Sequence, residues 1–158
     1  MTDTICQYLT FSVDGQTYAL PVPVVREVIE CGEITRVPTL PRAVRGVINL
    51  RGTVIPVMDL AIRFGRSATP VTPTTCIVVV DAEVDGEPTA AGLLVDSVNQ
   101  VVDELALEPA PHFGTAVPAD LLAGVAQLRA GVAHVLALGR VLDLGEVGAG
   151  ARQAVTAP

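Results

Sequence analysis

Short apolar stretches separated by turn residues dominate the hydrophobic pattern of this chain. Residues 8–13 predict a strand with two faces, in which Leu9, Phe11 and Val13 point inward and Tyr8, Thr10 and Ser12 point outward. Asp14-Gly15 is a turn dipeptide, so residues 17–22 are expected to return as the hairpin partner of that strand.

In residues 21–30, PVPVVREVIE, the apolar residues recur with the period of a helix rather than that of a strand. Val24, Val25, Val28 and Ile29 fall at helical spacing behind Pro23, a residue that suits a first helical turn. This spacing predicts a short helix that ends near Cys31-Gly32.

The rest of the chain again indicates hairpins. After a proline-rich edge or loop at 34–41, the apolar runs 43–50 and 53–60 are joined by Arg51-Gly52, where glycine supplies the positive φ of a turn. The polar, proline-rich residues 66–75 are predicted to connect two lobes. Further strands are expected at 76–84, 89–98, 99–105, 121–128 and 132–138, and a short closing helix within 139–147. About nine or ten short strands predict an all-β fold of barrels or a sandwich, and they exclude a parallel βαβ sheet.

The amino-acid composition limits the classes of partner that the chain is expected to bind. The 158 residues include no lysine and ten arginines, against seventeen acidic residues, which gives a net charge of -7. With no basic cluster in the sequence, nucleic acid and anionic membrane surfaces are not expected partners. Three cysteines far apart, Cys6, Cys31 and Cys76, indicate reduced core thiols. Without a signal peptide or a long apolar segment, the chain is expected to be soluble and intracellular, with no membrane insertion.

Candidate chemistry is sparse. His112 and His134 have no metal-ligand spacing, and no serine lies in a nucleophile elbow. The carboxylates Asp96, Asp103 and Glu104 are best explained as solvated strand ends. The sequence therefore predicts no catalytic residue, metal or cofactor, and a protein that works by contacting other proteins.

Residues 37–65, VPTLPRAVRGVINLRGTVIPVMDLAIRFG, resemble the signature of the CheW family, the coupling proteins of bacterial chemotaxis. The resemblance continues in residues 8–30, 91–103 and 121–138. It implies two packed SH3-like five-stranded β-barrels with one or two short helices. These would form one domain of two lobes over residues 5–144, followed by a disordered tail at 145–158.

The resemblance also implies a function without catalysis. A member of the family couples the cytoplasmic tip of a chemoreceptor to the regulatory domain of the histidine kinase CheA, and further copies can join it in rings. We therefore expect a cytoplasmic adaptor recruited to membrane-associated receptor arrays. Adaptors of twitching or developmental pathways belong to the same family and stay open as alternatives. A small β-barrel enzyme or ligand binder is a remote third, and it predicts a closed polar pocket near His112 or His134.

Partner-binding positions follow from the resemblance, residue by residue. In residues 24–30 it assigns coupling to kinase or receptor to positions on the predicted helix, and in residues 49–52 it marks a turn whose arginine bears on kinase control. In residues 91–98 it points to the lining of a receptor-binding groove. The predicted partner-binding residues are Val25, Glu27, Val28, Asn49, Arg51, Gly52, Gly92 and Val98.

Simpler explanations compete for most of these positions. Val25 and Val28 could serve core packing, Glu27 could be a solvated residue, and Gly52 and Gly92 could be required only by backbone shape. Arg51 is the strongest candidate for a contact, because a guanidinium between two apolar strands can present planar, bidentate donors to a partner.

Overall fold

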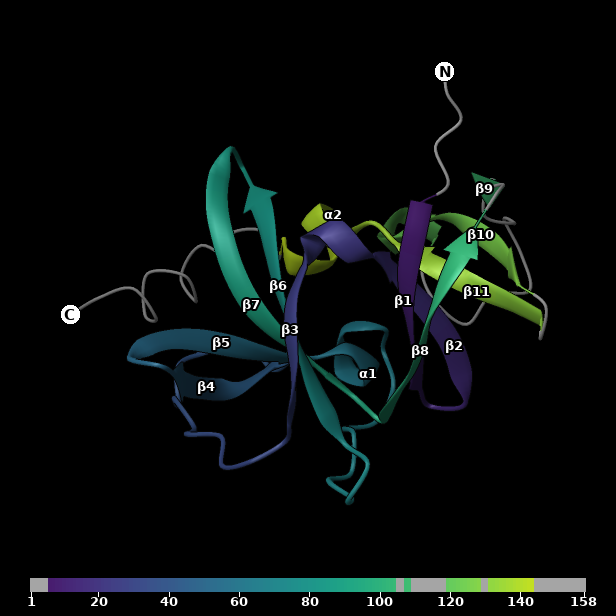
Figure 1. Cartoon of the computed structure of the whole chain (residues 1–158). Coiled ribbons are helices and arrows are strands. Elements are labelled where there is room, and N and C mark those ends of the chain that lie inside the picture. Colours follow the sequence, from purple (N-terminus) through teal and green to yellow (C-terminus); the bar gives the residue numbers. More distant parts are fainter. Residues whose placement is uncertain (1–5, 105–106, 109–118, 129–130, 144–158) are drawn as a thin grey trace.

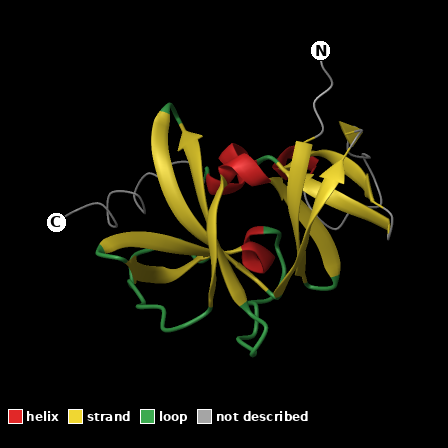
Figure 2. Ribbon diagram, viewed as in Figure 1, coloured by secondary structure: helices red, strands yellow, loops and turns green. Residues whose placement is uncertain are grey.

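The computed structural model describes residues 6–104, 107–108, 119–128 and 131–143, and these form two curled β-sheets that pack against each other (Figures 1 and 2). The first sheet has the strand order β8-β1-β2-β11-β10-β9. Its strands are β1 (Cys6–Val13), β2 (Gln16–Pro21), β8 (Ser97–Glu104), β9 (Leu107–Glu108), β10 (Leu122–Leu128) and β11 (Gly131–Leu136). The second sheet has the order β3-β6-β7-β5-β4. Its strands are β3 (Val25–Glu30), β4 (Val44–Leu50), β5 (Thr53–Asp59), β6 (Cys76–Val84) and β7 (Glu87–Val95).

This topology confirms the all-β fold and corrects two details. The first sheet has six strands in the described part of the chain, not five, because the short β9 extends it beyond β10. Residues 66–75 do not separate the lobes, because β5 before them and β6 after them belong to the same sheet. The chain changes sheets instead between β2 and β3 and between β7 and β8. His112 and the tail 145–158 lie outside the described residues.

Local turn chemistry explains the hairpins that the sequence predicted. Three two-residue links in the described part of the chain have a non-glycine residue and then a glycine, both at positive φ, which is the geometry that matches the twist of antiparallel strands. The pairs are Asp14 (49°) with Gly15 (81°), Arg51 (51°) with Gly52 (89°), and Asp85 (54°) with Gly86 (79°). The hairpins β1–β2, β4–β5 and β6–β7 confirm these turns.

The helix predicted for residues 21–30 is wrong. Only η1 (Val22–Val24) is helical, a single 3-10 turn, and β3 then runs antiparallel to β6. The run of Val and Ile that gave helical spacing also suits a strand, and pairing with the buried β6 decides between the two. Along β3, half-buried and exposed residues alternate, with a bulge between Val25 and Glu27.

Within the described residues, the hydrophobic core is divided into three clusters. The largest lies between the two sheets and includes Phe11 and Val13 from β1 and Val78 and Val80 from β6. Alternate residues of β6, such as Ile77, enter a second cluster to which all five strands of the second sheet contribute. Because successive residues of a strand point to opposite faces, β6 is buried on both.

A third, smaller cluster fills the curl of the first sheet and corrects the predicted outward face of β1. Tyr8 packs there among alanines such as Ala19 and Ala133, whose small side chains leave space for its ring. Thr10 is also buried, and its hydroxyl donates to the carbonyl oxygen of Gln100 at 2.8 Å. The predicted inward positions of β1 are confirmed.

Two short helices join the lobes. α1 (Leu60–Arg63) follows β5. α2 (Leu138–Leu142) follows β11 and overlaps residues 139–147, the range predicted to hold a short closing helix, but begins one residue before it. Arg63 donates to the carbonyl oxygens of Val141 at 2.8 Å, Arg140 at 2.9 Å and Asp143 at 3.1 Å. Arg63 thus attaches α1 to the C-terminal end of α2, where the Arg140 carbonyl oxygen also accepts a hydrogen bond from the Asp143 N–H at 3.2 Å.

Candidate partner-binding surface

The hairpin between β4 and β5 carries three of the predicted site residues. Leu50 pairs with Thr53, so Arg51 and Gly52 alone make the turn. The Asn49 side chain accepts a hydrogen bond from the Gly52 N–H at 2.8 Å and fixes the turn from within. Asn49 and Gly52 therefore shape the backbone that presents Arg51.

Arg51 is not an isolated contact residue, because its guanidinium meets the carboxylate of Glu27 on β3. Nη1 donates to Oε2 and Nη2 donates to Oε1, each at 2.6 Å, which is a bidentate ion pair. The hydrogen bond from Arg51 is the main cause that lowers the pKa of Glu27, and the bond to Glu27 raises the pKa of Arg51. The Arg51 side chain is 71% exposed and that of Glu27 is 21% exposed, so the pair lies at the surface.

This ion pair closes the second sheet upon itself. β3 and β4 are the two edges of that sheet, yet Glu27 on β3 and the turn at the end of β4 meet. Residues after β3 continue the seam, since Thr35 and Val47 exchange backbone hydrogen bonds at 2.9 and 2.8 Å. The curled sheet therefore becomes a barrel, with the Glu27–Arg51 pair on its seam.

Val25, Val28 and Val98 lie at the margin of the core between the sheets. Val25 and Val98 are partly buried against that cluster. Val28 is opposite Val78, which belongs to the same cluster, and directly opposed residues of antiparallel strands point to the same face. Val28 nevertheless remains 40% exposed, so it offers apolar surface to a partner.

Gly92 allows close packing of β7 against β6 and is not exposed for contact with a partner. It is buried on β7, and a Cβ there would lie 2.6 Å from Cγ2 of Ile77 and 3.5 Å from Cγ2 of Val57. Its φ does not require glycine; the close approach of β6 does. Gly92 therefore does not line an exposed groove.

Sequence reasoning missed a buried polar network beside this surface. Asp59, fully buried at the end of β5, accepts from Arg45 at 2.7 Å, from Thr69 N–H at 2.8 Å and hydroxyl at 2.7 Å, and from Ala61 N–H at 3.0 Å. An Asp directly before the apolar start of a helix is an N-cap signal, and it could have predicted the Ala61 bond. The contacts with Arg45 and Thr69 depend on how the loop 66–75 folds back.

The described residues offer little that would serve a catalytic or metal site. Within the described residues no group of three His, Cys, Asp or Glu side chains could hold a metal ion. His134 on β11 packs its ring 5.8 Å from that of Tyr18, and its Nδ1 is buried without a hydrogen-bond partner in the described structure. Burial raises the pKa of Tyr18. Among helices of the described part, none is long and apolar enough to cross a membrane.

Comparison with known proteins places this geometry in a family. A family model described as the CheW-like domain matches residues 7–146. The chain belongs to the CheW family. In the crystal structure of the scaffolding protein TtCheW from Thermoanaerobacter tengcongensis, a chain 31% identical in sequence superposes with a TM-score of 0.78, covering 91% of this chain and 92% of that one.

Curated relatives agree with the CheW assignment. The chemotaxis protein CheW of Klebsiella aerogenes is 27% identical over 124 residues, which cover 77% of this chain and 72% of the relative. Protein PilI of Pseudomonas aeruginosa is 33% identical over 88 residues, 56% of this chain and 47% of that protein. In this chain the fold carries both the Glu27–Arg51 seam and the apolar margin of Val25, Val28 and Val98.

Proposed function

We propose that this CheW-family protein is a non-enzymatic adaptor that couples the cytoplasmic tip of a chemoreceptor to the regulatory domain of the kinase CheA. The observation that carries the proposal is the match of the CheW-like domain to residues 7–146. Two surface features support it: the Glu27–Arg51 ion pair, and the exposed Val28, which follows Glu27 on β3 and points to the opposite face of that strand. The protein then acts in the cytoplasm, recruited to receptor arrays, where further copies can join in rings.

The apolar margin between the sheets suits a receptor helix. An amphipathic helix binds by placing its apolar face against such a surface. Val28 is the exposed member of the margin, and Val25 and Val98 are its partly buried members. Helix contact would cover area that the inter-lobe core leaves exposed, which stabilises the complex by the hydrophobic effect.

The Glu27–Arg51 pair supplies an oriented polar contact. Two N–H groups of the guanidinium are held by the carboxylate, and the other N–H donors of this 71% exposed side chain face away from it. An arginine fixed by one carboxylate loses less side-chain entropy when it donates to a partner. The kinase or the receptor would therefore meet a preoriented donor rather than a flexible one.

Binding assays with matched variants test this proposal. The purified protein is titrated against the CheA regulatory domain and a receptor cytoplasmic tip from the same organism. We expect Arg51→Ala to weaken binding to at least one of them, whereas Arg26→Ala leaves binding unchanged. Arg26 is the control because it also lies on the surface in an ion pair, with Asp81, on the strand that carries Glu27.

The apolar contact has its own pair of variants. Val28→Ser is expected to weaken the receptor complex, and Val132→Ser, at a 50% exposed position on the other sheet, is not. If wild-type protein bound neither the receptor tip nor the kinase domain, the proposed coupling would be wrong. The similarity to PilI would then direct the same titrations to the receptor and kinase of a twitching or developmental pathway.

A further inference from the structure

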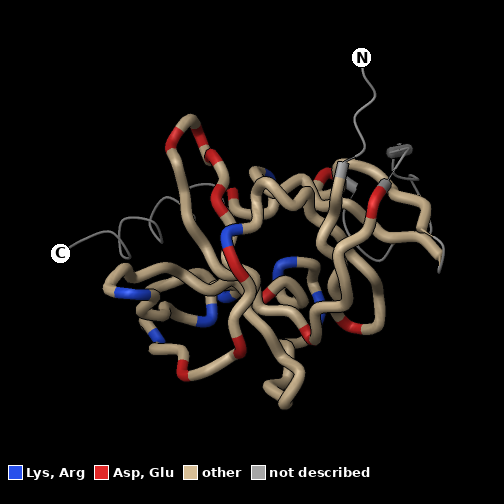
Figure 3. Tube along the Cα trace, viewed as in Figure 1, with Lys and Arg blue, Asp and Glu red and all other residues tan. Residues whose placement is uncertain are grey.

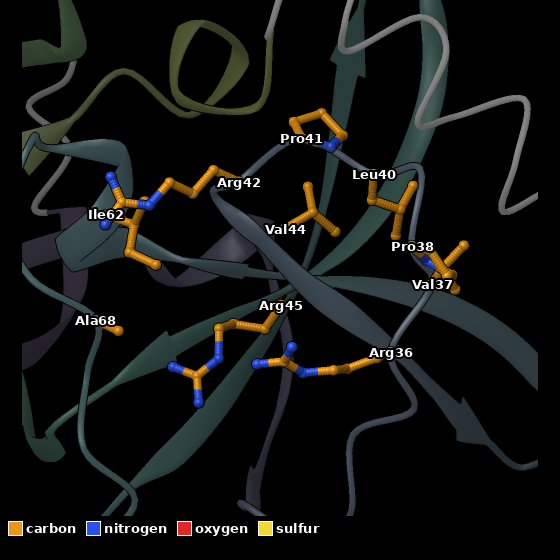
Figure 4. Close-up of a pocket in the computed structure, with 10 residues that line it drawn as sticks. All are labelled: Arg36, Val37, Pro38, Leu40, Pro41, Arg42, Val44, Arg45, Ile62 and Ala68. Carbon is orange, nitrogen blue, oxygen red and sulfur yellow. The ribbon is translucent and has the colours of Figure 1, made fainter.

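A pocket of about 520 Å³ opens on the second sheet, away from the residues assigned above. It is built from the loop 36–42, the start of β4, α1 and the connector 66–75, and Figure 4 shows its lining side chains. Three of the ten arginines of the chain, Arg36, Arg42 and Arg45, line it, and no acidic residue does among the described residues. In a chain with a net charge of -7, whose acidic and basic positions are coloured in Figure 3, this is a local concentration of positive charge.

The three guanidinium groups differ in how they are held. Arg45 is fixed from beneath by the buried Asp59 at 2.7 Å and by the carbonyl oxygen of Thr69 at 3.1 Å, and its side chain is 25% exposed. Arg36 and Arg42 are exposed, and within the described residues neither has a hydrogen bond or an ion pair. Asp59 balances Arg45, so the charges of the other two arginines remain uncompensated in the pocket.

Apolar surface separates these charges. Val37, Leu40, Val44 and Ile62 line the pocket and are each partly buried. Figure 4 shows Arg36 and Arg45 extending toward one region of the pocket, with Arg42 beside Ile62. A ligand that satisfies this arrangement carries anionic groups on both sides of an apolar group.

The loop that frames the pocket is already shaped. Pro38 and Pro41 restrict its backbone, and the Val44 N–H donates to the carbonyl oxygen of Pro41 at 2.9 Å. A framed loop loses little entropy on binding. Because Arg36 and Arg42 are exposed rather than enclosed, the site is open along one side, which suits an extended segment better than an enclosed small molecule.

We propose that this arginine pocket binds an acidic peptide segment of a partner protein, with carboxylates that meet Arg36 and Arg42 on either side of an aliphatic side chain. Charge complementarity selects the occupant, because guanidinium groups form charge-assisted, bidentate bonds with carboxylates. The site is separate from the Glu27–Arg51 seam and does not depend on the adaptor function proposed above.

The test uses the full chain and a fluorescent peptide in which two glutamates flank a leucine. Fluorescence anisotropy is expected to show saturable binding that weakens with added salt, as contact between exposed charges predicts. The double variant Arg36→Gln/Arg42→Gln should lose at least about tenfold in affinity, the loss expected when bonds between charged groups are removed. A peptide with glutamine in place of both glutamates should bind no better than that variant.

Matched controls separate this site from general charge attraction. Arg26→Gln/Arg140→Gln removes the same charge from exposed positions outside the pocket and should leave the affinity within about twofold of wild type. Thermal unfolding of both double variants verifies that they fold. Equal losses in the two double variants, equal binding of the glutamine peptide, or no saturable binding of the acidic peptide would overturn the proposal.

Two other results would show that the arginine pocket binds something other than an acidic peptide. Inorganic phosphate that displaces the peptide at concentrations below those of the peptide itself would indicate a small-anion site. Self-association of the chain that the Arg36→Gln/Arg42→Gln variant abolishes, without peptide binding, would indicate a second copy. Receptor and kinase titrations of the same variant should be unaffected, since Glu27 and Arg51 are unchanged.

Discussion

Replacing Asp59 by asparagine tests the buried network that anchors the loop 66–75. The carboxylate is fully buried, and each of its oxygens accepts two hydrogen bonds. Oδ2 faces two donors that cannot accept, the guanidinium of Arg45 and the N–H of Thr69. The amide nitrogen of asparagine must therefore take the Oδ1 position, where the Thr69 hydroxyl can rotate to accept but the Ala61 N–H cannot.

The expected loss in the free energy of unfolding of Asp59→Asn follows from this geometry. Asparagine leaves the Ala61 N–H facing a donor, and it removes the negative charge opposite Arg45. Breaking a buried ion pair by neutralising one partner costs about 3–5 kcal/mol. The Arg45 side chain is 25% exposed and keeps part of its hydration. We therefore expect the lower end of this range, a loss of about 3 kcal/mol. For a chain of 158 residues that corresponds to a fall in Tm of roughly 6–12 °C.

Thermal unfolding followed by circular dichroism, with urea unfolding for the free energy, measures this effect. The control is Asp81→Asn, which neutralises the partner of Arg26 in an exposed ion pair and should cost less than about 1 kcal/mol. If Asp59→Asn were no more destabilising than Asp81→Asn, the network would not carry the stability assigned to it. Asp59→Ala, which leaves all of the donors unpaired, should be at least as destabilising as Asp59→Asn.

Three further predictions concern other contacts. Gly92→Ala places a Cβ 2.6 Å from Cγ2 of the buried Ile77 and should cost about 1–3 kcal/mol in urea unfolding; wild-type stability would show that β6 and β7 can separate freely. Arg63→Ala removes three hydrogen bonds to carbonyl oxygens at the end of α2 and should cost about 1.5–3 kcal/mol, with faster amide exchange in α2 as the specific sign. Glu27 should titrate below its ordinary pKa of 4.5 by NMR, so that its stabilising pair is complete above that value and is lost as the pH falls through the lowered pKa. Arg51→Ala should return the Glu27 pKa toward 4.5, and a titration that stays low in this variant would contradict the ion pair as its cause.

The segment 21–30 shows where pattern reasoning reached its limit. Val24, Val25, Val28 and Ile29 satisfy a helical period, while the same stretch also alternates in burial as a strand. A window this short does not separate the two periods. Pairing with β6 determines that residues 25–30 form a strand, because the backbone groups along the edge of β6 are satisfied by β3.

The candidate site was found in part from the sequence. Family resemblance pointed to Glu27 and Arg51 separately, and residue type alone suggested that Arg51 would contact a partner. Nothing local connects these two residues, because they are 24 positions apart, with Glu27 on β3 and Arg51 in the turn between β4 and β5. Their bidentate pair exists because the second sheet curls until its two edges meet, and that curl depends on the packing of the whole barrel.

The sequence by itself determined the local elements. Turn dipeptides such as Asp14-Gly15 and Arg51-Gly52 set the hairpins, because few residue pairs adopt positive φ twice in succession. The tertiary structure alone decided which sheet each strand joins and that β1 and β6 are buried on both faces. It also decided that Arg51 lies against Glu27 and that Arg36, Arg42 and Arg45 share a pocket. These outcomes depend on contacts between distant segments, whose free energy arises only when the two curled sheets close and pack together.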